Sequence, residues 1–246
     1  MAAPKRGAAA AAPRAASSPR RPSGPVEDYL KIIYDLGRGE SPASTNEIAR
    51  RLGVSPASVS GMVRRLAEQG LLTHALYRGV TLTRAGKRAA LRTVRRHRVI
   101  ETYLVRVLGY PWEGVHAEAE RLEHVASDGL IERMAAALGA PREDPHGAPI
   151  PSPEGEVEEG ADLPLTELAR GERARVARVS DEDPALLRDL AALRLTPGAE
   201  VEMLETAPSA RGLIVRIDRS RVKVQRGLAA LVRVRRGPGK ARAAKR

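Results

Sequence analysis

Two stretches of the sequence place imidazole and carboxylate side chains at helical spacing. The larger set falls at offsets of 0, 4, 7 and 8 along the chain and comprises His116, Glu120, Glu123 and His124. These offsets put the four side chains on one face of a helix. Upstream, His97 and Glu101 are also four residues apart, so two helices could point ligand atoms into a common space. The pattern predicts a metal site, although a single Glu or His is more often a solvated surface group.

The available ligand types restrict the ion. The chain has no cysteine, which excludes disulfides, thiolate catalysis and sulfur-rich zinc or iron–sulfur sites. Carboxylate oxygen and imidazole nitrogen suit manganese, magnesium or ferrous iron better than copper or a structural zinc. No His-Glu-x-x-His motif, phosphate-binding glycine loop or nucleophile elbow is present, so an enzyme is not expected.

The elements that must position these ligands begin with a predicted DNA-binding head. Apolar residues at helical spacing predict a first helix over 27–36. A capping box of Ser44 and Glu47 predicts the start of a second helix, and Gly53 ends it in a tight turn. A third helix follows with Ser55 as its N-cap. Two short helices joined by a glycine turn predict a helix-turn-helix.

The third helix, 56–68, is expected to read DNA. Its apolar residues face inward, and its outward side chains are small, polar or basic. The N-cap Ser55 and Arg78, at the tip of the predicted wing, are added to these side chains. The predicted DNA-contacting set is Ser55, Ala57, Ser58, Ser60, Gly61, Arg64, Arg65 and Arg78. Hydroxyl groups can bond base edges or phosphates, an alanine methyl can touch thymine, and arginines neutralise phosphate. For any one of these residues, an ordinary solvated helix face is the simpler alternative.

Two alternating segments, 71–74 and 80–83, flank a glycine turn and predict the hairpin of a winged helix. Longer helices are expected over 84–108 and 112–138, separated by the breakers at 109–111. Because both are long and amphipathic, they suit a dimer interface, and the metal-ligand candidates lie on them.

The charge balance favours a polyanionic partner. The formal net charge is +12 and the pI is about 10.7, which favours nucleic acid, although solubility or attraction to anionic lipid is an alternative. No apolar run approaches the roughly 18 residues of a membrane span, and the N-terminus lacks the apolar centre of a signal peptide, so a cytoplasmic protein is expected. The first 25 residues contain no acid and predict a disordered basic arm, with a transit peptide as the alternative.

The predicted fold class is α+β. Alternating apolar segments beyond the Pro-, Gly- and Glu-rich stretch predict four or five strands and a helix in a small barrel. The expected regions are a basic arm (1–25), a winged-helix DNA-binding domain (26–92), an all-α dimerisation and metal-binding domain (93–140), a linker (141–163), a small β-barrel domain (164–236) and a basic tail (237–246).

From Glu27 to about Pro151 the residues resemble the diphtheria toxin repressor and manganese transport regulator family of metal-dependent repressors. The matching stretches are 27–30, Val59-Ser60, Tyr77-Arg78-Gly79, Arg96-His97-Arg98, Glu120-x-x-Glu123-His124 and 145–151. The resemblance implies a homodimer in which ion binding links the first helix to the dimerisation helices and sets the spacing of two heads on a pseudo-palindromic operator. Residues from about 163 to 235 resemble the FeoA-like, SH3-like domain of longer members, most clearly at 195–201.

Carried over position by position, the resemblance implies a primary metal site formed by Asp28, His97, Glu120, Glu123 and His124. His116 and Glu101 match ligands of an ancillary site. Asp183 lies near a further ancillary position, but an N-cap ahead of Pro184 is at least as good an account of it.

Two positions bear on the identity of the ion. Where iron-sensing relatives have a methionine and a cysteine, this chain has Asp28 and Glu120, as in manganese sensors, so Mn(II) is expected and Fe(II) is the alternative. Lys31 stands where some manganese sensors supply another carboxylate, which leaves the number of ions open. The leading hypothesis is a manganese-dependent repressor of metal-homeostasis genes; the alternatives are an iron(II)-dependent regulator and a non-specific basic DNA-binding protein.

Overall fold

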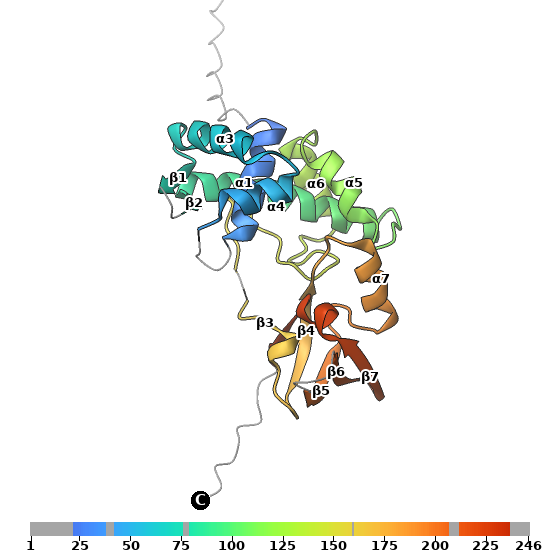
Figure 1. Cartoon of the computed structure of the whole chain (residues 1–246). Helices are drawn as coiled ribbons and strands as arrows, with labels where there is room; N and C mark the ends of the chain where they lie inside the picture. The colour runs from blue at the N-terminus through green and yellow to red at the C-terminus, as the bar shows by residue number, and fades with distance from the viewer. Residues whose placement is uncertain (1–21, 38–41, 76–78, 159, 207–211, 237–246) are drawn as a thin grey trace, which may run out of the picture.

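A mainly helical body and a C-terminal sheet domain form the two ends of the molecule (Figure 1). The computed structural model describes residues 22–37, 42–75, 79–158, 160–206 and 212–236. The predicted contact Arg78, the tail 237–246 and residues 1–21 of the predicted arm lie outside the described residues.

The head has the elements that its local signals predict. They are α1 (Gly24–Leu36), α2 (Thr45–Leu52), α3 (Pro56–Glu68), β1 (Leu72–Ala75) and β2 (Gly79–Leu82). Both hydrogen bonds of the Ser44–Glu47 capping box are present, and Gly53 ends α2 in the left-handed region with a φ of 65°. The first helix begins before Glu27 because Pro25, with its fixed φ, fits the first turn of a helix.

Helix α4 (Arg84–Arg106) belongs to two cores. Its first half packs Leu91 and Val94 into the core of the head, and its second half packs Val99 and Ile100 into a separate helical core. Helices α5 (Val115–Glu123) and α6 (Asp128–Ala137) complete that second core. A metal ligand at the middle of α4 therefore lies where the two cores meet.

The single long helix expected over 112–138 is wrong. The chain leaves the helix after Glu123 and starts α6 at Asp128, because Ser127 is an N-cap whose side chain accepts from the Leu130 amide. The break matters for the site, since it places His124 at the very end of α5.

The C-terminal domain contains one antiparallel sheet with the order β3-β8-β4-β5-β6-β7. Its elements are β3 (Leu163–Pro164), the 3-10 helix Leu165–Glu167, β4 (Arg173–Val179), α7 (Pro184–Ala192), β5 (Glu200–Thr206), β6 (Gly212–Ile217), β7 (Ser220–Gln225), α8 (Arg226–Ala230) and β8 (Val232–Arg236). Among the described residues β3 and β7 remain sheet edges, so the expected closed barrel is not confirmed.

The Pro- and Gly-rich segment expected to be a linker is packed against both ends of the molecule. The amide of Val179 on β4 donates to the His146 carbonyl over 3.0 Å. A Cβ on Gly147 would lie 2.1 Å from the Ala177 carbonyl oxygen, so only glycine fits there. On the other side, Arg98 Nη1 of α4 donates to the Pro149 carbonyl over 2.5 Å, so this segment connects the sheet domain to the helical body. No helix within the described ranges has the length and apolar character needed to span a bilayer.

Candidate metal centre

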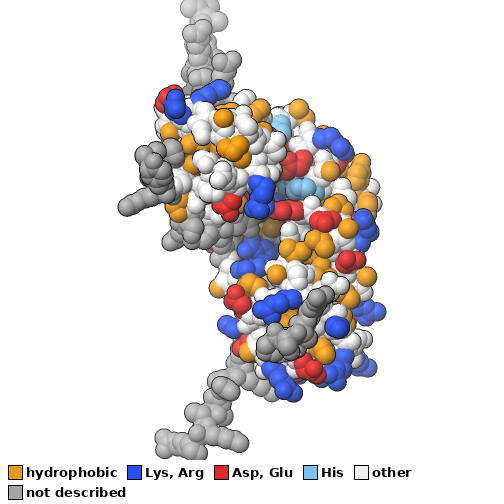
Figure 2. All heavy atoms as spheres, viewed as in Figure 1, with side chains coloured by type: hydrophobic (Ala, Val, Ile, Leu, Met, Phe, Trp, Pro, Cys, Tyr) orange, Lys and Arg blue, Asp and Glu red, His pale blue; other side chains and the backbone are white. Residues whose placement is uncertain are grey.

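The predicted ligands converge where α1, α4 and α5 meet. Figure 2 shows histidine and acidic side chains close together on the surface of the helical body. We distinguish a first group, comprising Asp28, His97, Glu120, Glu123 and His124, and a second group, comprising His97, Glu101, His116, Asp144, His146 and Asp181. Four of the five histidines of the chain belong to these groups.

In the first group, α1 from the head meets the end of α5. The Asp28 Oδ1 atom lies 2.8 Å from His124 Nε2, and Glu123 Oε1 lies 3.5 Å from the same nitrogen. Burial, together with repulsion from Glu123 and Glu120 and only partly offset by His124, raises the pKa of Asp28. A cation between these carboxylates would relieve that repulsion.

The ring of His124 is oriented from behind by Glu27. Its Nδ1 atom lies 2.8 Å from Glu27 Oε2, which leaves Nε2 facing Asp28. Glu27 is itself buried and accepts from Arg96 Nη2 over 2.5 Å, while Arg96 Nε donates to the Glu123 carbonyl over 3.0 Å. Such outer partners commonly fix the ring and tautomer of a metal-binding histidine. Neither Glu27 nor Arg96 was predicted from sequence as a site residue.

Lys31 occupies the other half of the first group. Its Nζ atom donates to Glu120 Oε1 over 2.6 Å and to both Glu123 oxygens over 3.1 Å, and lies 3.3 Å from His97 Nδ1. Burial opposes the charged ammonium, but the two carboxylates outweigh it and raise the pKa of Lys31. The same ammonium outweighs burial at Glu120 and lowers the pKa of that carboxyl. The first group therefore already contains an ammonium in contact with its carboxylates.

His97 joins the two groups through its two ring nitrogens. Its Nδ1 lies 2.5 Å from Glu123 Oε2 in the first group, and its Nε2 lies 3.0 Å from Glu101 Oε1 and 3.1 Å from His116 Nδ1 in the second. Burial disfavours the charged ring, but the Glu101 carboxylate and the hydrogen bonds raise the pKa of His97 to about 10. The resemblance assigned His97 to the primary site alone, but its two ring nitrogens contact both groups.

The second group combines side chains from α4, α5, the 141–157 segment and the sheet domain. The Asp181 Oδ2 atom, just after β4, lies 3.7 Å from His116 Nδ1 and 4.0 Å from His146 Nδ1. Glu101 Oε2 lies 3.8 Å from the same His146 nitrogen. Burial, followed by repulsion from Glu101, raises the pKa of Asp144 to about 6. At His146, burial is outweighed by Glu101, and the pKa rises to about 9.

Among the described residues, three buried atoms of the second group have no hydrogen-bond partner: Glu101 Oε2, Asp144 Oδ2 and His146 Nδ1. Asp144 Oδ2 does form an ion pair with Arg98 Nε at 3.4 Å. Their residues can all offer ligand atoms within 4.8 Å of one another. Unpaired buried polar atoms are costly, so these three atoms point to a further partner. A hard divalent ion fits this set of oxygen and imidazole ligands.

Asp183 lies outside both groups. Its side chain accepts from the Ala185 amide over 2.8 Å and caps α7, while Asp181, two residues earlier, approaches His116. Sequence reasoning missed Asp144, His146 and Asp181. His146 stood within a motif that was noted, but nothing local indicated that a Pro- and Gly-rich segment would bury it.

The predicted DNA-contacting residues lie along the outer face of α3. Val59, Val63 and Leu66 are buried, whereas the predicted contacts at positions 57, 58, 60, 61, 64 and 65 are exposed. Ser55 caps the helix through the Ser58 amide, and the Ser60 hydroxyl donates to the Pro56 carbonyl. Helix α3 lies at the end of the molecule opposite the sheet domain (Figure 1). A winged helix tied through α1 to a ligand centre defines the class of metal-dependent DNA-binding regulators.

Comparison with known proteins places the chain within this class. Three family models match in succession: the N-terminal DNA-binding domain of iron-dependent repressors at 23–80, their metal-binding and dimerisation domain at 83–152, and the FeoA domain at 163–236. The iron-dependent repressor IdeR of Mycobacterium leprae is 35% identical over 222 residues, which cover 85% of this chain and 96% of that protein. The chain belongs to the iron-dependent repressor family, whose members are transcriptional repressors and not enzymes.

Solved structures agree with this assignment. A manganese-dependent transcriptional repressor in complex with manganese superimposes with a TM-score of 0.80 at 41% identity, over 86% of this chain and all of that chain. The manganese regulator SloR superimposes with a TM-score of 0.72 at 31% identity, over 86% of this chain and 98% of that chain. The relatives thus include both iron-dependent and manganese-dependent repressors.

Proposed function

We propose that this protein is a manganese-dependent repressor of metal-homeostasis genes, which binds a pseudo-palindromic operator as a homodimer in the cytoplasm. One observation carries the choice of metal: both ligand groups consist only of carboxylate and imidazole side chains. Such ligands suit Mn(II), whereas a sulfur ligand would favour softer ions. The manganese-dependent repressors among the similar structures support the same choice.

The proposed mechanism couples the ion to the head through α1. Asp28 lies on α1, and Glu123 and His124 lie at the end of α5, so an ion held by these three residues would link the head to the helical body. The ion would supply positive charge between carboxylates that repel one another. Glu27 holds the ring of His124, so that its Nε2 is available as a ligand. Fixing the head in this way would set the spacing of two α3 helices in a dimer.

The test is operator binding measured with a series of divalent metals. After selecting operator sequences from a random pool, we expect Mn(II) to tighten binding at least tenfold and Asp28→Asn to remove most of that gain. Asp35→Asn, on the same helix but outside both groups, is the matched control. Equal binding with and without metal, or full metal dependence in Asp28→Asn, would refute the proposal.

An iron(II)-dependent regulator is the second candidate, because IdeR proteins are among the relatives and ferrous iron accepts the same ligands. Anaerobic titration of operator binding with Fe(II) and Mn(II) separates the two. We also propose an SH3-like barrel for the C-terminal domain, and the limits 26–92, 93–140 and 164–236 for the three domains. They rest on the FeoA match and on the separate hydrophobic cores.

A further inference from the structure

The positive charge of this protein is concentrated outside its DNA-reading head. Residues 163–246 contain 19 Lys and Arg against 10 Asp and Glu, a net charge of +9. Residues 27–162, which include the winged helix and the helical domain, contain 18 against 20, a net charge of −2. Because the field of a protein follows its charge distribution, the C-terminal part is the stronger attractor of polyanions.

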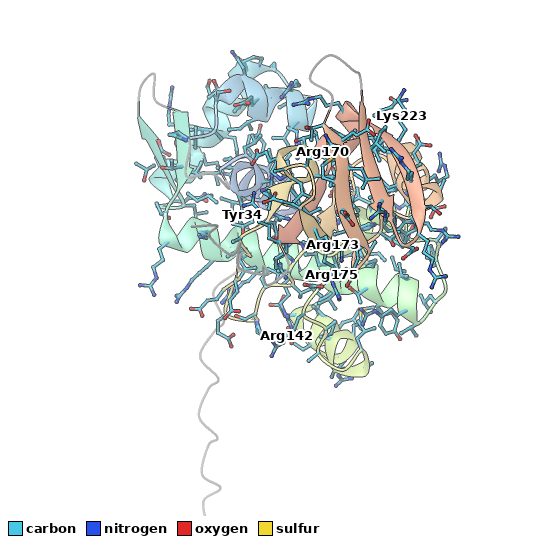
Figure 3. All side chains as sticks on the ribbon, turned by 90° about the horizontal axis from the view of Figure 1, so that it is seen from below. Tyr34, Arg142, Arg170, Arg173, Arg175 and Lys223 are labelled. Atoms are coloured by element: carbon cyan, nitrogen blue, oxygen red, sulfur yellow. The ribbon has the colours of Figure 1, made fainter. Side chains whose placement is uncertain are left out.

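Within the sheet domain, the cations gather on the outer face of the sheet. The inward side chains of its strands form the core, and the outward ones include Arg173, Arg175, Arg216, Arg221, Lys223 and Arg235. In the view from below, Arg170, Arg173 and Arg175 are labelled one below another near the middle, and Lys223 lies at the upper right (Figure 3). We call this surface the basic sheet face.

The basic sheet face places like charges directly opposite one another. Arg175 on β4 is the register partner of Arg235 on β8, and Arg216 on β6 is the register partner of Arg221 on β7. Like charges in opposed positions destabilise a sheet. Each of these four arginines contacts a carboxylate, which relieves part of that cost, and an anion lying across the strands would relieve more of it.

Acidic neighbours neutralise only part of the face. Glu200 pairs with Arg175 at 3.2 Å, and Glu202 is shared by Arg173 at 3.2 Å and Arg216 at 2.9 Å. Glu205 pairs with Arg221 at 2.9 Å, and Asp162 pairs with Arg235 at 3.1 Å. Exposed ion pairs of this kind are weak. These arginines stay largely solvated, since the Arg173 side chain is 79% exposed. Lys223 and Arg170 are exposed and have no ion pair within the described ranges. Of the six cations that define the face, Lys223 has no ion pair among the described residues, and the five arginines can exchange their exposed ion pairs for contacts with an external anion.

We propose that the basic sheet face binds the phosphate backbone of duplex DNA without sequence preference. The choice of DNA among polyanions rests on the proposed function, because a repressor works where duplex DNA is abundant. The sheet lies at the opposite end of the molecule from α3 (Figure 1), so this DNA is either a flank of the operator or a second duplex. Backbone contacts from arginine and lysine carry affinity but no sequence information.

The experiment measures the salt dependence of binding to a random-sequence duplex, with the full chain held metal-free by a chelator. The face variant is Arg175→Gln with Lys223→Gln. The control is Arg188→Gln with Arg194→Gln, exposed residues on and just after α7 that remove the same charge. Each lost phosphate contact reduces the slope of log affinity against log salt by about 0.9. A fourfold rise in salt should therefore weaken the unmodified protein about tenfold more than the face variant.

A slope unchanged in the face variant, or reduced equally in the control, would overturn the proposal. Tighter, face-dependent binding of a structured RNA than of the duplex would overturn the assignment to DNA. A further measurement uses the selected operator in the presence of metal. If the face binds DNA that flanks the operator, the face variant should bind a long duplex more weakly than the unmodified protein does, and a short duplex equally well. If the face binds a second duplex, complexes that contain two differently labelled duplexes should form with the unmodified protein and not with the face variant. Neither result would count against the proposal. Metal independence of operator binding would refute the proposed function alone, because the random-duplex measurement contains no metal.

Discussion

The two ligand groups share His97 but satisfy their charges in opposite ways. In the first group, the Lys31 ammonium lies 2.6 Å from Glu120 and 3.1 Å from Glu123, so the carboxylates already have a cation. In the second group, buried atoms of Glu101, Asp144 and His146 have no hydrogen-bond partner within the described part of the chain. The comparison teaches that a side-chain ammonium joins the carboxylates of one ligand set, whereas buried ligand atoms of the neighbouring set keep bonding capacity for an added ion.

The largest expected effect comes from breaking the first group at Glu123, which is fully buried and faces both Lys31 and His97. Glu123→Gln should weaken Mn(II) binding at least about 100-fold and destabilise the metal-free protein by about 3 kcal/mol, because it leaves buried cations without their carboxylate. Isothermal titration and denaturant unfolding measure both effects. Glu118→Gln, on the same helix, should change neither quantity, and an unaltered affinity in Glu123→Gln would remove this residue from the site.

A smaller effect is expected from His146→Gln in the second group. A site filled at 100 times its dissociation constant stabilises the fold by about 2.7 kcal/mol. The variant should lose about that much of the stabilisation that saturating Mn(II) gives the unmodified protein, measured by unfolding with and without metal. Asp183→Asn, which can still cap α7, should retain all of it. If Asp183→Asn lost the stabilisation by metal and His146→Gln kept it, Asp183 rather than His146 would belong to the second group.

Lys31→Met tests whether the resident cation limits the first group to one ion. Removing the ammonium should destabilise the metal-free protein by roughly 2 kcal/mol, because Glu120 and Glu123 then repel one another. It should also raise the manganese bound per chain by one ion, as counted by equilibrium dialysis with elemental analysis. Lys87→Met, at an exposed position on α4, controls for loss of charge. An unchanged stoichiometry would show that Lys31 does not take the place of an ion.

A dependence on pH is expected in the unmodified protein. His97 and His146 have pKa values raised to about 10 and about 9, above the 6.5 of an ordinary histidine. Both therefore stabilise the metal-free fold fully below about pH 6.5, and this contribution is lost as the pH rises towards 9 and 10. Metal must displace these protons, so Mn(II) affinity should rise up to about tenfold per pH unit for each proton released. Unfolding in chelator and metal titration from pH 6 to 9 measure the two trends, and a flat stability profile would contradict the protonated histidines.

Local rules accounted for the head. The capping box at Ser44, the left-handed Gly53 and the N-cap at Ser55 end or start helices through contacts within a few residues, so their boundaries could be read from the sequence. The break between α5 and α6 was missed because 124–127 contains neither glycine nor proline, and the cap at Ser127 competes with an otherwise continuous helical pattern.

By itself, the sequence determined the class of protein, its helix-turn-helix and the ligands that share a helical face, because helical spacing fixes which side chains are neighbours. Only the tertiary structure decided that His97 serves two groups and that Lys31 fills half of the first. It also decided that Asp144, His146 and Asp181 complete the second. These residues come from a packed segment and a separate domain, and contacts between distant parts of a chain depend on how whole elements pack rather than on local spacing.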